Sequence, residues 1–215
     1  MLLNKSKIII LAAGCSRRLR HLTRDSPKSF LEVGGKRIID YHLDNLSSYG
    51  FEEINIVVGY LKEKFFSEIG DEYKGIKINY ILADDYDTTG HSWSLFLARE
   101  LWSETDSSVI LIHADLLCDP RIITDMINSS HDNVISVSNT VKDVNEGDFA
   151  ITGNNDKVTS IEKGISMDSI NTKGVYVGAG KFSNEFMQSF EIFRQKNHLT
   201  LYLELVKVFS TIFTV

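Results

Sequence analysis

Short apolar runs alternate with amphipathic segments along the first two thirds of the chain. Runs rich in β-branched and aliphatic residues predict five strands, at Lys7–Leu11, Glu53–Val58, Ile76–Leu82, Val109–His113 and Val134–Ser138. Apolar residues at helical spacing predict helices between them, over Ile38–Ser48, Lys62–Ile69, Ser92–Trp102 and Pro120–Asn128. This alternation is typical of a mostly parallel sheet with helices on both faces, a three-layer α/β/α arrangement.

Two of these helices carry more detailed expectations. The helix over Ser92–Trp102 is expected to turn one face inward, formed by Trp93, Phe96, Leu97 and Leu101. In the helix that begins at Pro120, the missing N–H of proline fits the first turn.

The pattern changes after residue 138. The apolar segments Phe149–Thr152 and Val158–Ile161 flank the turn Gly153-Asn154-Asn155-Asp156, which predicts a hairpin. A strand over Gly174–Gly180 and a helix over Ser183–Gln195 follow. Ser183 is expected to cap this helix, with Phe186 and Phe190 inside. No internal repeat or long linker occurs, so residues 1–215 are expected to form one α/β domain with a small antiparallel insertion.

Composition and charge narrow the class of protein. The 215 residues are 43% apolar and 24% charged, as in ordinary globular proteins. The net charge of −6 argues against a nucleic-acid partner, because surfaces that coat nucleic acids are basic. The apolar stretch Leu199–Val215 is short for a bilayer and is interrupted by Glu204 and Lys207, so no membrane partner is expected. Two cysteines, Cys15 and Cys118, lack metal-ligand spacing and favour a reduced, cytoplasmic protein.

The first predicted strand leads into a turn of small residues, Leu11-Ala12-Ala13-Gly14-Cys15-Ser16, which is followed by the cations Arg18 and Lys28. Small residues let backbone N–H groups approach a phosphate, and fixed cations neutralise it. The turn lies at the carboxyl end of a strand, where open α/β sheets bind ligands. Neither the Walker A nor the dinucleotide glycine pattern is present. The run predicts a triphosphate site.

A longer pattern extends from this turn, Leu11-Ala12-Ala13-Gly14…Arg18-Leu19…Thr23…Pro27-Lys28…Leu31…Val33…Gly35-Lys36…Ile39-Asp40-Tyr41. This pattern resembles the signature of the nucleotidyltransferase family. Members include sugar-phosphate nucleotidyltransferases and choline-phosphate-type cytidylyltransferases, which join a nucleoside triphosphate to a phosphorylated acceptor. The resemblance implies a Rossmann-like fold and assigns Arg18 and Lys28 to the triphosphate as catalytic cations. Ser16 replaces the second glycine of the family pattern L-A-A-G-x-G-x-R-L, and Lys36 is either a ligand contact or solvated.

A candidate metal ligand follows the strand Val109–His113. Asp115 matches the family aspartate that binds Mg²⁺ at this position, and Mg²⁺ prefers carboxylate and phosphate oxygens. The alternative for Asp115 is a helix N-cap, and His113 is expected to be a packed strand residue. The stretch Leu201–Val206 resembles the place where choline-phosphate cytidylyltransferases of bacterial surface decoration carry L-Y-W-D. Glu204 is then a second metal ligand, or else a charged residue on an apolar helix.

Two further stretches concern the base and the acceptor. The segment Trp93-Ser94-Leu95-Phe96-Leu97-Ala98 follows Thr89, Gly90, His91 and Ser92. It is closer to the cytidylyltransferase pattern Y-S-L-x-L-A than to the pattern G-T-A-x-A-L of sugar nucleotidyltransferases. This favours CTP, with the four preceding residues in the nucleotide site; the alternative for His91 is capping or packing.

The segment Val158–Gly164 resembles the V-x-x-I-x-E-K-P of sugar nucleotidyltransferases, which assigns Glu162 and Lys163 to the acceptor. Gly164 replaces the proline. The following Lys173-Gly174-Val175-Tyr176-Val177 resembles the N-x-G-I-Y strand of those enzymes. The acidic residues Asp143, Glu146 and Asp148 either face a cationic acceptor or form a solvated loop.

These features together predict a Mg²⁺-dependent nucleotidyltransferase. It would transfer CMP from CTP to phosphocholine, a phosphonate or a polyol or sugar phosphate, with release of pyrophosphate, for surface polysaccharide or lipid decoration. The alternatives are a sugar-1-phosphate uridylyl- or thymidylyltransferase and a catalytically silent nucleotide-binding relative. The apolar residues before Val215 are expected either to be buried in a homodimer or to precede a missing segment that completes the acceptor site.

Overall fold

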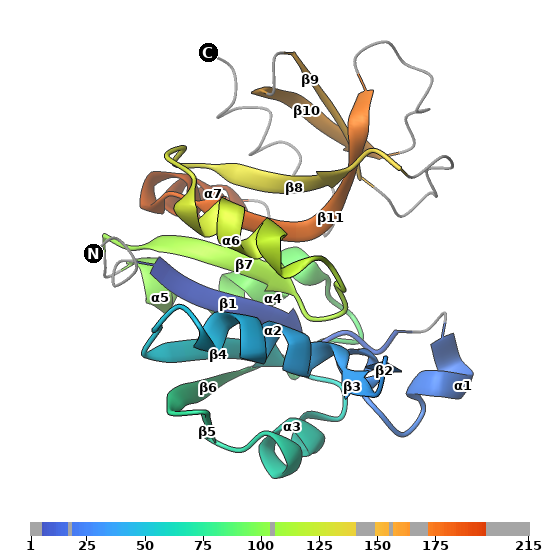
Figure 1. Ribbon diagram of the computed structural model, residues 1–215. Helices are drawn as coiled ribbons and strands as arrows, with labels where there is room; N and C mark the ends of the chain where they lie inside the picture. Colours follow the sequence, from blue (N-terminus) through green and yellow to red (C-terminus); the bar gives the residue numbers. More distant parts are fainter. Residues whose placement is uncertain are drawn as a thin grey trace.

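A computed structural model describes residues 6–16, 19–103, 106–140, 149–154, 157–163 and 172–196, and nine strands of this part form one sheet (Figure 1). The strands of this sheet are β1 (Ser6–Ala12), β4 (Glu53–Val58), β5 (Glu72–Tyr73), β6 (Ile76–Leu82), β7 (Ser108–His113), β8 (Val134–Ser138), β9 (Phe149–Asn154), β10 (Lys157–Lys163) and β11 (Thr172–Phe182). The helices are α1 (Arg20–Thr23), η3 (Lys28–Phe30, a 3₁₀ turn), α2 (Ile38–Ser47), α3 (Lys62–Glu68), α4 (His91–Leu97), α5 (Glu100–Ser103), α6 (Pro120–Asn128) and α7 (Asn184–Lys196).

The strand order is β10-β9-β11-β7-β1-β4-β6-β5, with β8 paired to β11. The central strands β7, β1, β4 and β6 are parallel to their neighbours in this group. β11 runs antiparallel to β7, and β9 and β10 form the predicted antiparallel hairpin, in which Lys157 pairs with Asn154. The predicted mixed α/β fold is therefore confirmed, and the carboxyl ends of the parallel strands meet at one edge of the sheet.

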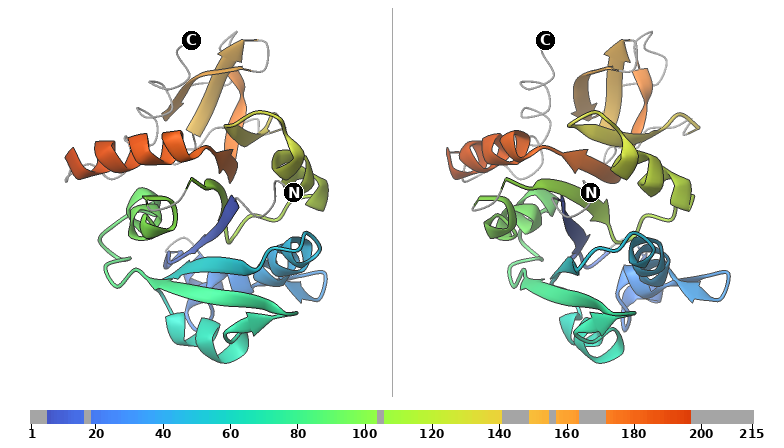
Figure 2. Two further views of the ribbon diagram at one scale, coloured as in Figure 1. Left: turned by 90° about the vertical axis from the view of Figure 1, so that its left-hand side faces the viewer. Right: turned by 60° about the vertical axis from the view of Figure 1, so that its left-hand side comes forward.

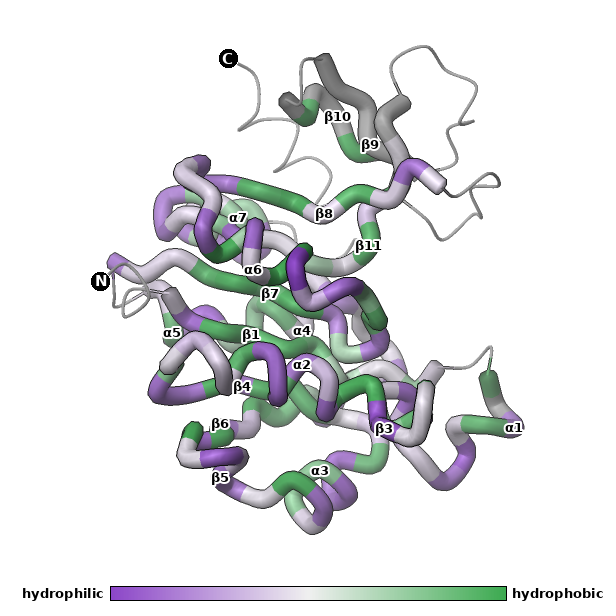
Figure 3. The backbone as a smooth tube through the Cα atoms, in the orientation of Figure 1, coloured by the Kyte–Doolittle hydropathy of each residue, from purple (hydrophilic) through white to green (hydrophobic). Residues whose placement is uncertain are grey.

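Helices cover both faces of the sheet, as the alternation of strand and helix predicted. Successive residues of β1 face opposite sides, with Ile8 and Ile10 in one core cluster and Ile9 and Leu11 in the other. The first cluster includes residues of α2, α3 and α6, and the second includes residues of α4, α5 and α7. Figure 2 shows α2 and α6 on one side of the sheet and α4 and α7 on the other. Figure 3 shows how hydrophobic the central strands are, as expected for strands buried on both faces.

Two of the predicted helix starts are confirmed at atomic detail. Pro120 occupies the first turn of α6, and the Asp119 side chain caps that helix by accepting a hydrogen bond from the backbone N–H of Arg121 at 2.9 Å. The N-cap is therefore Asp119 and not Asp115. Ser183 caps α7 by accepting from the N–H of Phe186 at 3.1 Å.

The helix predicted over Ser92–Trp102 is instead two helices, α4 and α5, which meet at Ala98 and Arg99. Of the residues expected to share one face, Phe96, Leu97 and Leu101 are partly buried against the core. The fully buried apolar residues of the two helices and their junction are Leu95, Ala98 and Trp102. α4 contacts β1 and β4, and small side chains let a helix approach a sheet closely. Trp93 stacks on Phe96, which is partly buried, with ring centroids 5.5 Å apart.

Several short elements were not predicted from the pattern, namely α1, η3, β5 and the hairpin of β2 (Glu32–Val33) and β3 (Lys36–Arg37). They are too short to show a period of their own. The hairpin did leave a signal in Gly34-Gly35, because both glycines adopt positive φ, at 62° and 78°, which two-residue hairpin turns require.

Candidate functional site

A cleft of about 620 Å³ opens at the carboxyl edge of the parallel strands. Its walls come from the ends of β1 and β7, from η3, and from the segment between β6 and α4. The lining residues are Leu11, Ala12, Ala13, Gly14, Cys15, Ser16, Leu19, Lys28, Ser29, Tyr86, Asp87, Thr89, Gly90, His91, Ser94, His113, Ala114 and Asp115. Segments far apart in the sequence meet here because parallel strands end at the same edge of the sheet.

The turn after β1 forms one wall of the cleft and is tied to both neighbouring strands. The N–H of Tyr60, after β4, donates to the carbonyl of Ala13, and the N–H of Ala114, after β7, donates to the carbonyl of Leu11, both at 3.0 Å. A Cβ added at Gly14 would meet no protein atom within 4 Å, so the glycine leaves space in the wall. Ser16 has a φ of +47°, the left-handed conformation that favours glycine.

Lys28 reaches the cleft from η3, which is anchored to the core. The N–H of Phe30 donates to the carbonyl of Pro27 at 2.9 Å and closes the turn. The Phe30 ring is buried and packs edge-on against Phe65 of α3, with ring centroids 4.8 Å apart. With its 3₁₀ turn fixed in this way, the Lys28 ammonium lies 2.5 Å from the Oδ2 atom of Asp115.

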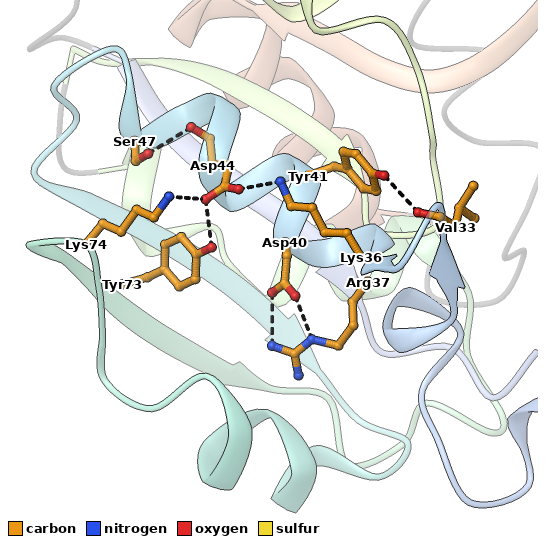
Figure 4. A network of polar contacts seen from close by, with 9 residues as sticks. All are labelled: Val33, Lys36, Arg37, Asp40, Tyr41, Asp44, Ser47, Tyr73 and Lys74. Atoms are coloured by element: carbon orange, nitrogen blue, oxygen red, sulfur yellow. Dashed lines mark hydrogen bonds and ion pairs between the residues drawn. The ribbon is translucent and has the colours of Figure 1, made fainter.

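A network of ion pairs supports η3 from behind (Figure 4). The Arg37 guanidinium lies over the Phe30 ring at 4.6 Å and donates to both carboxylate oxygens of Asp40 and to Glu68. The hydrogen bond to Asp40 raises the pKa of Arg37, in spite of partial burial. Arg37 thus connects β3, α2 and α3 around the segment that carries Lys28.

Lys36 belongs to the second half of this network. It pairs with Asp44, which also accepts from Lys74 and Tyr73 at 2.6 and 2.8 Å (Figure 4). Partial burial acts to raise the pKa of Asp44, but the two ammonium groups and the phenol hold this pKa far below its ordinary value. Lys36 is not among the residues that line the cleft.

Asp115 stands at the carboxyl end of β7, and its side chain is 42% exposed toward the cleft. Burial works to raise the pKa of this carboxyl group, but the hydrogen bond and charge of Lys28 lower it, so the group is ionised. His113 lies two residues earlier, and burial together with the nearby His91 lowers the pKa of its imidazole. The site therefore sets one ionised carboxylate and one ammonium beside an uncharged His113 ring.

Asp115 is suited to hold a magnesium ion. Mg²⁺ usually binds through one or two carboxylates, and it keeps waters or phosphate oxygens as its other ligands. An ionised, solvent-facing carboxylate beside a turn that leaves room for phosphate meets this requirement. Within the part of the chain that the structure describes, no cluster of three or more His, Cys, Asp or Glu side chains forms a closed protein cage for a metal.

Comparison with known proteins shows the family. The family model described as nucleotidyl transferase matches residues 7–163 of this chain. The chain belongs to the nucleotidyl transferase family.

Curated relatives of this nucleotidyl transferase differ in their named substrates. CMP-5'-(3-aminopropyl)phosphonate synthase of Streptomyces rubellomurinus is 30% identical over 136 residues, which are 63% of this chain and 21% of the relative. UTP--glucose-1-phosphate uridylyltransferase AglF of Haloferax volcanii is 46% identical over 72 residues, 34% of this chain and 30% of the relative. CTP:phosphoglutamine cytidylyltransferase of Campylobacter jejuni is 27% identical over 194 residues, 83% of this chain and 74% of the relative. The chain thus spans a fifth to a third of the first two relatives.

The fold of this nucleotidyl transferase also matches a solved structure. The inositol-1-phosphate CTP transferase of T. maritima superposes with a TM-score of 0.72 at 23% identity, covering 97% of this chain and 82% of that one. This likeness supports the Rossmann-like three-layer fold. No helix within the described ranges has the length and apolar character needed to cross a membrane.

Most of the predicted nucleotide-site residues of this nucleotidyl transferase share the cleft. The set is Leu11 to Ser16, Lys28, Thr89, Gly90, His91 and Asp115. Ser92 is buried behind the lining. Arg18 and Glu204, like the acidic residues Asp143, Glu146 and Asp148, lie outside the described residues. Glu162 and Lys163 lie on β10, and their side chains are not described.

Sequence reasoning missed five lining residues with polar side chains, namely Ser29, Tyr86, Asp87, Ser94 and His113. Three of them fall in or beside the stretch that was assigned to the base, so its boundaries were drawn too narrowly. His113 packs in its strand as expected and also lines the cleft. Its place two residues before Asp115 was the available signal, because alternate residues of a strand share a face.

Proposed function

We propose that this protein transfers CMP from CTP to a small phosphorylated acceptor and releases pyrophosphate. The observation that carries the proposal is the contact between the Lys28 ammonium and the Asp115 carboxylate at a cleft walled by the turn Ala13–Ser16. A turn of small residues, a fixed cation and a metal-binding carboxylate are the groups that a triphosphate requires. The relatives named for CMP or CTP favour cytidine as the base.

The reaction needs positioning and charge stabilisation more than a protein nucleophile. An acceptor phosphate or phosphonate oxygen attacks the α-phosphorus of CTP, a new P–O bond forms, and the bond to the leaving pyrophosphate breaks. Lys28 would stabilise the charge that develops on the α-phosphate, and Arg18 would hold the pyrophosphate through its planar guanidinium. Backbone groups from Leu11 to Ser16 would line the triphosphate.

We propose that Asp115 and Glu204 hold Mg²⁺, which would neutralise charge on the reacting phosphates. Lys28 has a second role in this scheme. Its ammonium is the partner of the Asp115 carboxylate in the structure. A bound triphosphate would attract this ammonium away from the carboxylate, and Asp115 would then be available to hold the metal.

The remaining assignments follow the geometry of the cleft. Thr89, Gly90 and His91 line it at the start of α4 and would contact the nucleotide, with Ser92 packed behind them. Glu162 and Lys163 of β10 are proposed for the acceptor phosphate, which is a phosphocholine, a phosphonate or a polyol or sugar phosphate. A reaction that consumes a nucleoside triphosphate fits the cytoplasm, and we propose that residues 1–215 act as one catalytic domain.

A second candidate is a sugar-1-phosphate uridylyl- or thymidylyltransferase. The observation that favours it is the 46% identity with a glucose-1-phosphate uridylyltransferase over 72 residues. The same triphosphate chemistry applies, and the base and acceptor differ. A catalytically silent nucleotide-binding relative is the third alternative, against which the presence of Lys28 and Asp115 counts.

One assay separates these functions. Each nucleoside triphosphate is incubated with Mg²⁺ and with phosphocholine, 2-aminoethylphosphonate, polyol phosphates or hexose 1-phosphates, and pyrophosphate release is measured. Release with CTP and one small acceptor is the expected result. Release with UTP or dTTP and a sugar phosphate supports the second candidate instead, whereas nucleotide binding without release from any pair contradicts an active transferase with these substrates.

Asp115→Asn is expected to abolish Mg²⁺-dependent pyrophosphate release while the fold survives, because the amide keeps the size of the side chain and removes the charge that holds the metal. Asp125→Asn is the matched control, since Asp125 is an exposed residue of α6 outside the cleft lining. Turnover by Asp115→Asn at the control rate would remove Asp115 from the reaction.

A further inference from the structure

β11 turns a corner at Gly178. From Ala179 to Phe182 it pairs with β7, and from Thr172 to Val175 it pairs with β9. Its pairing with β8 shifts in register between Tyr176 and Gly180, as at a β-bulge, and Gly178 has a φ of +100°. The corner thus directs β11 from the central sheet toward the hairpin β9–β10, which carries Glu162 and Lys163.

The side chain of His113 fills the inside of this corner. Ala179 pairs with Ile112, so Gly178 comes opposite His113. A Cβ at Gly178 would lie 2.9 Å from both the Cγ and the Nδ1 atoms of the His113 ring. Only a glycine lets the backbone approach the imidazole this closely. The Tyr176 ring meets the same imidazole edge-on, with centroids 5.9 Å apart and planes at 86°.

On its other side, the His113 ring meets the nucleotide wall of the cleft. His91, the first residue of α4, packs its ring 4.7 Å from the His113 ring at an interplanar angle of 52°. Both imidazoles line the cleft. His113 is therefore in contact both with the start of the helix α4 and with the corner of the strand β11.

We propose that His113 is a positioning residue that holds His91 and the Gly178 corner in one fixed arrangement, and so sets the spacing between the nucleotide and acceptor sides of the cleft. The inference rests on the proposed function for the identity of the two sides. It predicts that a planar ring is required at residue 113 and that the residue at position 178 has no side chain. The polar edge of the imidazole is not required for this role.

The first test measures the binding of CTP with Mg²⁺ by calorimetry. His113→Ala is expected to weaken binding about threefold to tenfold, because an aromatic contact that orients His91 is lost. His113→Phe keeps a ring and is expected to retain most of the affinity. His131→Ala is the control, since His131 is exposed on the loop after α6. Equal loss in His113→Ala and His113→Phe would overturn the role of the ring as a spacer.

The second test uses the acceptor that supports turnover with wild-type protein. A positioning residue between the two sides affects both substrates, so His113→Ala is expected to raise the KM of the acceptor together with that of CTP, and His113→Phe is expected to reverse most of the change. A change in the KM of CTP alone would limit His113 to the nucleotide side and would overturn the proposed spacing role.

The third test needs no substrate and therefore separates this inference from the proposed function. Gly178→Ala is introduced into the wild type and into His113→Ala, and thermal unfolding is measured. The strain of a side chain at positive φ is common to both backgrounds, whereas the clash with the ring is present only in the first. Gly178→Ala is expected to lower Tm more in the wild type. Equal decreases in the two backgrounds would contradict the contact.

Amide NMR spectra complete the substrate-free test if Gly178→Ala fails to fold. His113→Ala is expected to shift the amide signals of Gly90 and His91 as well as those of Gly178 and Ala179, and His113→Phe is expected to shift them less. Shifts confined to β7 would overturn the inference. Absence of CTP binding by wild-type protein, with these amide shifts present, would contradict the proposed function and leave the positioning role supported.

Discussion

At the scale of single residues, the ammonium and the carboxylate to which we assign the reaction, Lys28 and Asp115, form an ion pair. The Lys28 and Asp115 side chains are 32% and 42% exposed, so their ion pair is partly screened by water and is weak enough to exchange. The pairing keeps a carboxylate ionised at the cleft and keeps an ammonium close to where a phosphate would bind. In the proposed function, an exchange of partners on nucleotide binding would couple metal binding to nucleotide binding.

Lys28→Met is expected to raise the affinity of the nucleotide-free protein for Mn²⁺ about twofold to fivefold, because the competing ammonium is lost. The same change should slow pyrophosphate release by orders of magnitude, because the transition state loses a cation. Manganese binding is measured by calorimetry. Lys36→Met, which removes an ammonium paired with Asp44 outside the cleft lining, serves as the control. Unchanged Mn²⁺ affinity in Lys28→Met would contradict the exchange.

Ser16 stands where the family pattern has a glycine, and its backbone angle shows why glycine suits this position. Its φ of +47° is the reason that a glycine is favoured at this position. We expect Ser16→Gly to retain CTP binding and Ser16→Val to lose about 1–2 kcal/mol of folding stability, because a β-branched side chain is strained in this conformation. Urea unfolding and calorimetry with CTP measure the two effects. Equal stability of the valine and glycine variants would show that the turn relaxes out of the left-handed region.

At the scale of elements, Arg37 connects the short turn η3, which has no periodicity of its own, to the helices α2 and α3. The guanidinium pairs with Asp40 of α2 (Figure 4). It also covers Phe30 of η3 and reaches Glu68 of α3. Lys28 is two residues from Phe30, so the placement of this cation depends on a contact formed outside the cleft. The residue before α2 is thereby part of the support of the site.

Arg37→Gln is expected to lower the free energy of unfolding by about 1–2 kcal/mol, since several charge-assisted hydrogen bonds are lost from a mostly buried side chain. It should also weaken CTP binding, because η3 is less firmly placed. Lys64→Gln is the control: the Lys64 side chain is 41% exposed and lies 3.8 Å from the same Glu68, so its loss should change stability by less than about 0.5 kcal/mol. Similar effects of the two variants would indicate that the Glu68 contact alone matters.

At the scale of the whole molecule, a buried histidine is expected to make folding sensitive to acid. His42 of α2 is 4% exposed, and burial lowers its pKa to about 4, although a hydrogen bond with the backbone of Leu116 acts in the opposite direction. In the unfolded chain the pKa is about 6.5. Between these values the unfolded state binds a proton that the folded state does not. His113, whose pKa is also lowered by burial, acts in the same direction.

The contribution of His42 to stability is therefore complete above pH 6.5 and is lost as pH falls toward 4, by at most about 3 kcal/mol. We expect the urea midpoint to decrease between pH 7.5 and pH 5, and His42→Gln to reduce this decrease. His131→Gln, at an exposed histidine, should leave it unchanged. A decrease of the same size in His42→Gln would show that other groups cause the acid sensitivity.

Much of the fold was predictable from the sequence because its signal is local. Runs such as Glu53–Val58 and Ile76–Leu82 were predicted with the same bounds that the structure shows. β4 is buried along nearly its whole length, and β6 is rich in β-branched and aromatic residues, so both carry a local strand signal. Capping by Ser183 and the proline at the start of α6 also depend on neighbouring residues alone. The break between α4 and α5 was not predictable in this way, because their buried face is set by contact with the sheet.

The site was predicted in part for the same reason. The turn Leu11–Ser16, Lys28 and Asp115 each carry a local signal, namely small residues after a strand, a cation after proline and an acid at the end of a strand. The sequence by itself determined the order of strands and helices, the two-faced burial of β1, and the residue types at the cleft. These follow from side-chain volume, polarity and spacing along the chain.

Only the tertiary structure decided which of these residues meet. It paired Lys28 with Asp115, 87 positions apart, and it placed His113 between His91 and the corner of β11. It also placed Lys36 in an ion pair with Asp44, outside the lining of the cleft. Such contacts depend on strand order, register and helix packing, which are fixed by the closing of the whole core and leave no pattern in any single segment of the sequence.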